Sequence, residues 1–147
     1  MKNQSYQSLT PAVPSIAGNA TSLYQLVNKL QLSLLSQASV KKSFIINGID
    51  KSVAVFAEEN TLAYVIGSLL SNAVQSTSNC CIRVETVSIA DQLQIRIRNN
   101  SAFVYSSHMH IPGNFVDAAN KIGGNIGLET EGDNVITLVF SLAKKAA

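Results

Sequence analysis

The stretch NTLAYVIGSLLSNAVQST, residues 60–77, decides the fold of this chain. Its apolar residues recur every three or four positions, which is typical of a helix that packs one face on a core. A second face is almost entirely polar and carries Tyr64, Ser68, Asn72 and Gln75. Because small hydroxyl and amide side chains do not favour a helix, we expect this face to line a cavity or to meet a partner. The apolar face, which we expect to pack on a sheet, contains Leu62, Val65, Ile66, Leu69, Leu70, Ala73 and Val74.

The bulk composition is that of one globular domain. With 147 residues, the chain is long enough to bury a core. Only 14% of the residues are charged, against about 25% in soluble domains. Either a partner covers part of the surface, or the surface is simply rich in Ser, Asn and Gln. The net charge is +2, and no basic stripe with interleaved aromatic residues is present, so we expect no nucleic-acid partner.

Targeting and cysteine signals indicate a cytoplasmic protein. Residues 1–10 lack the apolar segment of a signal peptide, and no apolar run is long enough to span a membrane. Cys80 and Cys81 are adjacent, with no second cysteine or histidine pair at metal-ligand spacing. We therefore expect them to be reduced thiols.

The order of the remaining elements predicts an α+β fold. Residues 81–88 and 93–98 alternate apolar and polar side chains, which indicates a half-buried antiparallel hairpin. Pairs of strands separated by helices are typical of a two-layer α/β sandwich, here a mixed sheet with helices on one face. The other expected segments are a Pro/Ser-rich tail at 1–18, a helix at 21–37, strands at 43–46 and 52–57 around the turn Asn47-Gly48, a loop at 99–113, a helix at 114–122 capped by Asn114 and ended by Gly123-Gly124, and a hairpin of 125–130 with 135–142.

The N-terminal helix at 21–37 is apolar on more than one face. Ser22 and Gln25 have capping-box spacing at its start. Tyr24, Leu32 and Leu35 lie off the main apolar stripe, so either a second helix or a second copy of the chain is expected to cover them. The stripe that we expect to face the sandwich contains Leu23, Leu26, Val27, Leu30 and Leu34.

Residues 68–73, Ser-Leu-Leu-Ser-Asn-Ala, resemble the N box of the histidine-kinase-type (GHKL) ATPase fold, which reads roughly N-L-L-x-N-A. The order of elements over 43–142 is similar to the ATP-binding domain of sensor histidine kinases and its gyrase-type and mismatch-repair relatives. The resemblance implies a tail at 1–18, an N-terminal helix and linker at 19–42, and a histidine-kinase-like ATPase domain at 43–147.

The resemblance also implies roles for three side chains of the N-box helix. Asn72 stands where the family holds Mg²⁺ against the nucleotide phosphates, and it is the expected metal residue if Mg-nucleotide binds. Alternatively, it is a buried Asn bonded to loop backbone. Ser68 takes the family's catalytic Asn or Glu position. Gln75 replaces a phosphate-binding Lys, whose charge a neutral amide does not supply.

The two glycine boxes of the family are largely lost. Asn99 replaces the Asp that accepts a hydrogen bond from adenine in D-x-G-x-G, and Ser101 and Phe103 replace its glycines. Of the second box, which holds phosphates at a helix N-terminus, Gly113 alone remains. The segment 118–126, with its Gly123-Gly124 pair, is similar to the family's helix-to-strand ending. This pattern is typical of a fold that is retained while its nucleotide site decays.

Histidines give no support for a self-phosphorylating kinase. Residues 1–42 contain no His, although the family's acceptor lies on the helix before the domain. His108 and His110 lie in the expected loop. They are either ordinary loop residues, or they form a metal pair or contain a phosphoacceptor.

These observations give two alternatives for function. The first is a degenerate histidine-kinase-like domain, a binding and regulatory module in two-component-type signalling with weak or no ATP binding and no enzymatic activity. Its partner would be a signalling protein or a second copy of the chain, met through the N-terminal helix. The second is a divergent ATP-binding catalytic domain of a split sensor histidine kinase, which would use ATP with Mg²⁺ in histidine-kinase-type phosphotransfer. Asn72, Gln75, Asn99 and Gly113 would form the nucleotide site.

Overall fold

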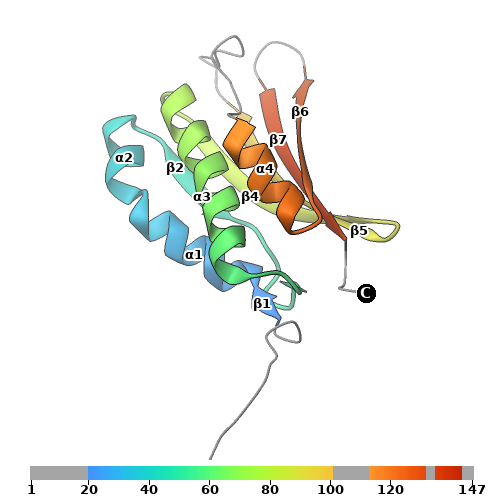
Figure 1. The fold of residues 1–147 in the computed structure, drawn as a ribbon. Helices are drawn as coiled ribbons and strands as arrows, with labels where there is room; N and C mark the ends of the chain where they lie inside the picture. The colour runs from blue at the N-terminus through green and yellow to red at the C-terminus, as the bar shows by residue number, and fades with distance from the viewer. Residues whose placement is uncertain (1–19, 101–112, 132–134, 144–147) are drawn as a thin grey trace, which may run out of the picture.

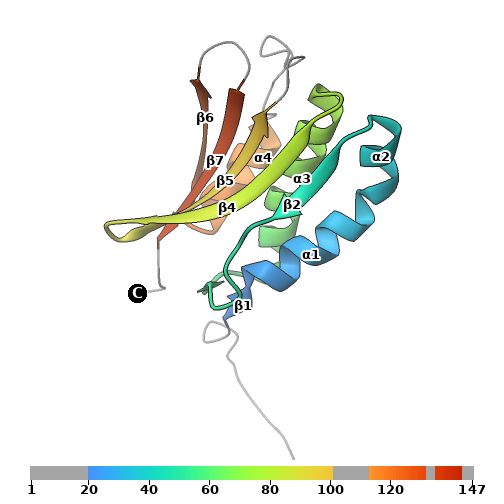
Figure 2. The ribbon, with the colours of Figure 1, turned by 180° about the vertical axis from the view of Figure 1, so that it is seen from behind.

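A five-stranded mixed sheet carries helices on one of its faces (Figures 1 and 2). The computed structural model describes residues 20–100, 113–131 and 135–143. The strand order is β2-β4-β5-β7-β6, with β2 parallel to β4 and the other neighbours antiparallel. The predicted two-layer α+β architecture is therefore confirmed. The elements are β1 (Thr21–Ser22), α1 (Leu23–Ser33), α2 (Leu35–Val40), β2 (Phe44–Asn47), β3 (Ala54–Val55), α3 (Glu59–Ser76), β4 (Cys81–Ile89), β5 (Gln92–Asn100), α4 (Gly113–Lys121), β6 (Asn125–Glu131) and β7 (Val135–Ala143).

Helix α3 lies against the sheet as the periodicity predicts, and all seven residues of its apolar stripe are buried. The carboxylate of Glu58 caps its first turn by accepting hydrogen bonds from the backbone N–H groups of Asn60 and Thr61 and from the Thr61 hydroxyl. The Thr61 hydroxyl contributes most to lowering the pKa of Glu58. The cap therefore stabilises the helix above the unfolded pKa of this carboxyl and is lost as the pH falls through its lowered folded pKa.

The central hairpin of β4 and β5 also has the predicted form. Ala90, in the turn, adopts a left-handed φ of 52°. One face of the pair is buried under the helices, and the other is uncovered within the described part of the chain (Figure 2). On the uncovered face the guanidinium of Arg96 pairs with Glu129 of β6, across the intervening strand β7.

Residues 43–57 do not form the local strand pair that the Asn47-Gly48 turn predicts. Instead β2 joins β4 in parallel, and β3 pairs with β1 in a separate two-stranded sheet. An isolated hairpin buries little apolar surface, whereas β2 places Ile45 in the main core. The Asn47 amide donates to the Tyr24 carbonyl and to the Asn28 side chain, which ties β2 to α1.

The N-terminal helical segment is part of the core. It begins at Leu23, after Ser22 accepts a hydrogen bond from the Gln25 N–H as the capping box predicts, and it breaks at Leu34 into α1 and α2. Tyr24 is half-buried against the core, with the Lys51 ammonium 5.3 Å from its ring centroid, so it is not part of an uncovered face. The sandwich-facing stripe is confirmed: Leu23, Leu26, Val27 and Leu34 are buried and Leu30 packs against them.

No helix within the described ranges has the length and apolar character that crossing a bilayer requires.

The glycine pair after α4 performs two different tasks. Gly123 has a φ of +76°, a left-handed conformation that ends the helix and strains any residue with a Cβ. Gly124 lies under β7: a Cβ added there would stand 2.6 Å from a Phe140 ring carbon and 2.7 Å from the Ser141 carbonyl oxygen. The pair therefore allows β6 to enter the sheet directly beside the core.

We expect Gly124→Ala to lower the free energy of unfolding by about 1–3 kcal/mol, because the added methyl group overpacks a filled site. Urea unfolding followed by circular dichroism measures the change. Gly127→Ala is the matched control, since a Cβ there meets nothing within 4 Å, and it should leave stability unchanged or slightly raised. Equal effects of the two substitutions would show that the close approach at Gly124 is not what the chain requires.

Candidate functional site

The polar face of α3 lines a hollow of about 480 Å³. Ser68, Asn72 and Gln75, which the sequence singles out, all contribute to it. The apolar stripe of α3 is fixed on the sheet, so the side chains on this other face have to point outward, and the predicted cavity is present. The full lining is Ala63, Tyr64, Gly67, Ser68, Ser71, Asn72 and Gln75 of α3, with Phe115 of α4.

Tyr64 joins α3 to the beginning of α4. Its hydroxyl accepts a hydrogen bond from the Asn114 amide at 2.6 Å, and its ring meets Phe115 edge to face with centroids 5.6 Å apart. The expected capping role of Asn114 is wrong, because α4 begins one residue earlier at Gly113 and the Asn114 side chain turns to Tyr64 instead. Gly113, the first residue of α4, thus directly precedes the two residues that hold α4 against α3.

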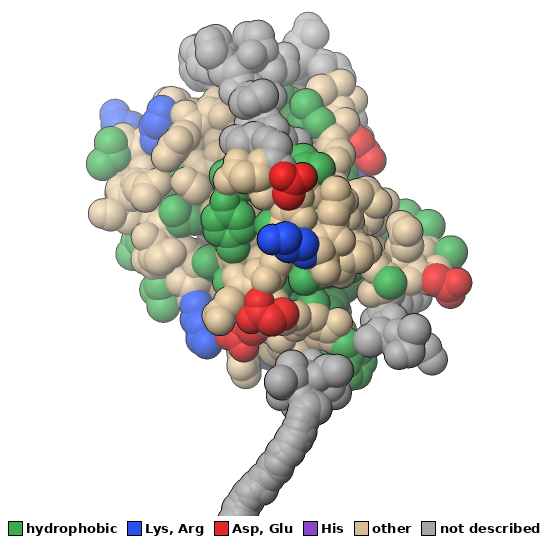
Figure 3. Space-filling model, in the orientation of Figure 1, with side chains coloured by type: hydrophobic (Ala, Val, Ile, Leu, Met, Phe, Trp, Pro, Cys, Tyr) green, Lys and Arg blue, Asp and Glu red, His purple; other side chains and the backbone are tan. Residues whose placement is uncertain are grey.

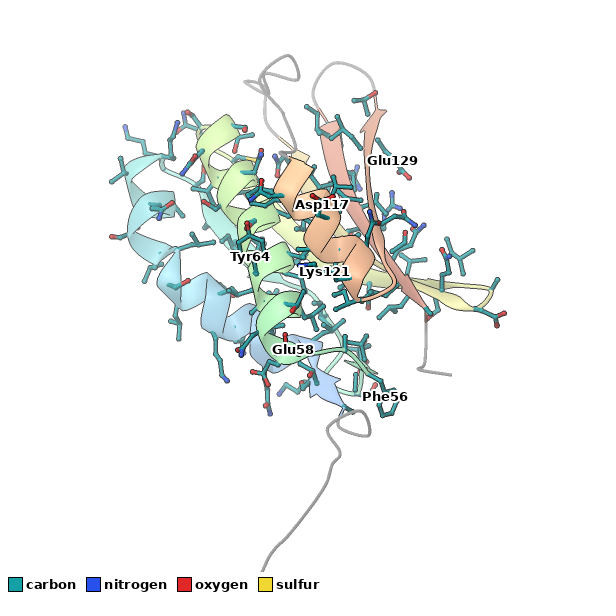
Figure 4. The ribbon with its side chains drawn as sticks, in the orientation of Figure 1. Phe56, Glu58, Tyr64, Asp117, Lys121 and Glu129 are labelled. Atoms are coloured by element: carbon teal, nitrogen blue, oxygen red, sulfur yellow. The ribbon has the colours of Figure 1, made fainter. Side chains whose placement is uncertain are left out.

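A second hollow of about 480 Å³ lies on the other side of Tyr64. It includes the charged pair Asp117 and Lys121, one turn apart on α4, which Figure 4 shows on the same side of the molecule as Tyr64. Around it, the helix side carries scattered charges of both signs among uncharged side chains (Figure 3). The remaining lining residues are Asn60, Thr61, Tyr64, Asn114 and Ala118.

The described lining of the first hollow carries no charged side chain. None of the residues that line it among the described positions is a Lys, Arg, His, Asp or Glu. The Asn72 carbonyl oxygen accepts a hydrogen bond from the Ser76 hydroxyl at 3.2 Å within the same helix. Within the described ranges, no three His, Cys, Asp or Glu side chains gather as a ligand set.

This lining does not fit a magnesium-bound nucleoside triphosphate. Phosphate oxygens are held in proteins by Lys or Arg side chains and by backbone N–H groups at a helix start, and Mg²⁺ is usually held through one or two carboxylates. The hollow offers hydroxyls, amides and aromatic rings instead. Its chemistry suits an uncharged ligand that can both donate and accept hydrogen bonds.

Asn99 lies apart from this lining, near the end of β5. It is fully buried, between Ile82 of β4 and Ile136 of β7 on the helix side of the sheet. Neither its amide nitrogen nor its amide oxygen has a hydrogen-bond partner among the described residues. Buried polar atoms are nearly always paired, so this residue is the most unusual polar group in the described core.

Ser101, Phe103, His108 and His110 lie outside the described residues. Sequence reasoning missed Asn114 and Phe115 as contacts of the N-box helix. Their position directly after Gly113, where the family's phosphate loop meets its helix, was the available signal.

Comparisons with known proteins identify the fold. Neither protein-family models nor curated proteins match the sequence. Among solved structures, the catalytic domain of histidine kinase ThkA matches at a TM-score of 0.69 and 14% identity, over 88% of this chain and 98% of that one. Acinetobacter baumannii histidine kinase AdeS matches at 0.72 and 9%, over 86% and 66%. Full-length ShkA in complex with AMPPNP matches at 0.69 and 16%, over 88% of this chain and 32% of that one. The fold of this chain is that of histidine kinase catalytic domains.

Replacing Asn99 by Leu, which has a similar shape, should raise the free energy of unfolding by about 1–3 kcal/mol, because a buried amide without partners is replaced by an apolar group. Chemical denaturation measures the change. Thr77→Val is the matched control: Thr77 is equally buried, but its hydroxyl donates to the Ala73 carbonyl at 2.8 Å, so losing it should lower stability. If Asn99→Leu is destabilising to the same degree as Thr77→Val, the Asn99 amide is satisfied in solution.

Proposed function

We propose that this chain is a degenerate histidine-kinase-like domain that acts as a binding and regulatory module in two-component-type signalling, with weak or no ATP binding. The observation that carries the proposal is the neutral hollow on α3, at the positions where the resemblance places phosphate and metal contacts. A site without a cation leaves the charge of a polyphosphate uncompensated. The retained fold, by contrast, preserves a surface through which such a domain can act.

Two of the histidine kinases with a similar fold were solved with a bound molecule. ShkA was solved with the nucleotide analogue AMPPNP, and ThkA was solved in complex with the response regulator TrrA. For this chain we propose that the protein-binding property is kept and that nucleotide-dependent phosphotransfer is not. The alternative, a divergent ATP-binding catalytic domain of a split kinase, is supported by Asn72, which lies in the hollow at the metal position.

Isothermal titration calorimetry with ATP and ADP in the presence of Mg²⁺ tests the proposal. We expect no micromolar binding to the unmodified chain. Gln75→Lys places a cation at the exposed rim of the hollow and should strengthen nucleotide binding about tenfold, since one charge-assisted hydrogen bond contributes on that order. Asp117→Asn, in the neighbouring hollow, is the matched control. Micromolar affinity of the unmodified chain for ATP would instead establish the catalytic alternative.

The partner surface that we propose is the outer side of α1 and α2. Leu32 and Leu35 are 73% and 58% exposed, although both are large and apolar. Exposed apolar patches on a domain usually mark an interface. We therefore propose that these helices pair with a second copy of the chain or with a helix of a signalling partner, in the cytoplasm.

Light scattering on the unmodified chain and on the double variant Leu32→Glu, Leu35→Glu measures self-association. We expect a dimer at high concentration that the double variant converts to a monomer without loss of stability, because the two positions are exposed within one copy. Leu128→Glu, on the opposite edge strand β6, is the matched control and should remain dimeric. A monomer in every case would contradict the dimer and leave a partner helix as the remaining form of the proposal.

A further inference from the structure

The turn that joins α2 to β2 carries apolar and basic side chains on the outside of the molecule. Val40 ends α2 and is 84% exposed, and Phe44 begins β2 and is 58% exposed. Between them, Lys41 is partly exposed and Lys42 is exposed. Figures 1 and 2 show this turn at an outer corner of the molecule, and Figure 3 shows basic side chains beside an apolar one there. We call Val40, Lys41, Lys42 and Phe44 the corner patch.

Hydrogen bonds hold the backbone of this turn in place. The N–H of Lys42 donates to the Ser39 carbonyl at 3.0 Å. The Lys41 carbonyl accepts from the N–H of Asn79, in the turn between α3 and β4, also at 3.0 Å. Lys42 has a left-handed φ of 56°, which is uncommon for a residue with a Cβ. The two basic side chains therefore extend from a backbone that two neighbouring turns fix together.

A third cation lies beside the corner patch on the uncovered face of the sheet. Arg83 is exposed, and it lies two residues along β4 from Cys81, which is the β4 partner of Phe44. Residues two apart on a strand share a face, so Phe44 and Arg83 lie on the same side of the sheet. The next residue of β4 on this face is Glu85, which stands directly opposite Arg96 of β5. The nearest carboxylate along this strand face therefore already has a cation across from it.

Positive and negative charges are separated along the molecule. The sequence contains no Asp or Glu from residue 1 to residue 49 or from residue 60 to residue 84. Glu58 and Glu59 lie at the beginning of α3, a helix of 18 residues, which is about 27 Å long. The corner patch lies at the other end of α3, because Asn79 of the turn that follows this helix donates to Lys41. An anionic surface would therefore attract the corner patch and repel the opposite end of the molecule.

The shape of the corner patch favours a lipid bilayer over an acidic protein. A stable protein–protein interface buries about 800 Å² on each partner, and four side chains at an outer corner present only part of that area. Neither hollow described above is lined by a residue of the patch. A lipid surface needs no complementary shape, because apolar side chains enter its interfacial layer while Lys and Arg stay at the anionic headgroups. The corner patch has both kinds of side chain.

We propose that the turn between α2 and β2 docks this chain reversibly on an anionic lipid bilayer. Val40 and Phe44 enter the interfacial layer, and Lys41, Lys42 and Arg83 contact the headgroups. Each cation near such a surface strengthens binding about fivefold, so three cations and two apolar side chains give weak, reversible binding that depends on salt and on lipid charge. The docking adds a location to the proposed regulatory module and requires no membrane-spanning helix.

Flotation of the full chain with lipid vesicles measures the docking. We expect flotation with vesicles of phosphatidylcholine that contain about 30% phosphatidylserine, and none with phosphatidylcholine alone. Raising NaCl from about 0.1 M to about 0.5 M should weaken binding at least about fivefold, because salt screens the attraction. The double variant Lys41→Gln, Lys42→Gln should lower the partition coefficient about 25-fold. The matched control is Lys51→Gln, Lys121→Gln, which removes the same charge from exposed positions elsewhere and should bind within about twofold of the unmodified chain.

The double variant Val40→Ser, Phe44→Thr tests the apolar side chains. Thr keeps a preference for strands at the start of β2, and circular dichroism checks that the variant is folded. We expect its partition coefficient to fall about tenfold, because less apolar surface leaves water on binding. Unchanged flotation of this folded variant would contradict the insertion of Val40 and Phe44.

Three further results would overturn the inference: no flotation with anionic vesicles, equal flotation with neutral and anionic vesicles, or equal binding by the Lys41, Lys42 variant and its control. Binding to poly-glutamate that needs the two lysines but not Val40 and Phe44, without flotation, would replace the bilayer by an acidic protein. Nucleotide calorimetry and light scattering are separate measurements, so a failure of lipid docking leaves the proposed function standing.

Discussion

The packing of α3 on the sheet determines where the candidate site lies. Seven apolar side chains of this helix are buried, and a helix has a fixed period, so the residues between them are forced onto the outer face. Tyr64, Ser68 and Gln75 line a hollow because their neighbours are held in the core. The two faces are also independent. A substitution at Gln75, which is exposed on the outer face, removes no core contact, so the chemistry of the hollow can change there while the fold is kept.

Helix α1 depends on the sheet in a different way. Strand β2 is an edge strand, and an uncovered edge invites pairing with other chains. The side chain of Gln31 donates to the Ile45 carbonyl at 2.8 Å, and Asn47 donates back to the Tyr24 carbonyl. The helix thus covers the edge of the sheet with polar contacts while its apolar stripe faces the core. Its remaining side, with Leu32 and Leu35, is left outside by the same geometry.

The sequence predicts those parts of the structure that follow from a local period. The burial of α3, the β4–β5 hairpin and the helix end at Gly123-Gly124 all come from spacing and from the conformations that glycine allows. The pairing of β2 with β4 could not be predicted in this way, because competition between two possible partner strands depends on how much core each would bury. Asn114 illustrates the same limit at one residue. Its type suits a helix cap, but Tyr64, fifty positions away, offers the amide a hydroxyl partner.

The candidate site, like the fold, has one part that the sequence predicts and one part that it does not. The sequence predicts that Ser68, Asn72 and Gln75 share a face, and the structure brings them into one hollow. That Asn99 is enclosed without a partner among the described residues could not be read from the sequence, since satisfaction of a buried amide depends on atoms from several strands. The two features differ in their consequences for stability. The polar side chains of the hollow, such as Gln75, lie on an accessible surface, where a substitution leaves the core unchanged, whereas an unpaired amide in the core opposes folding.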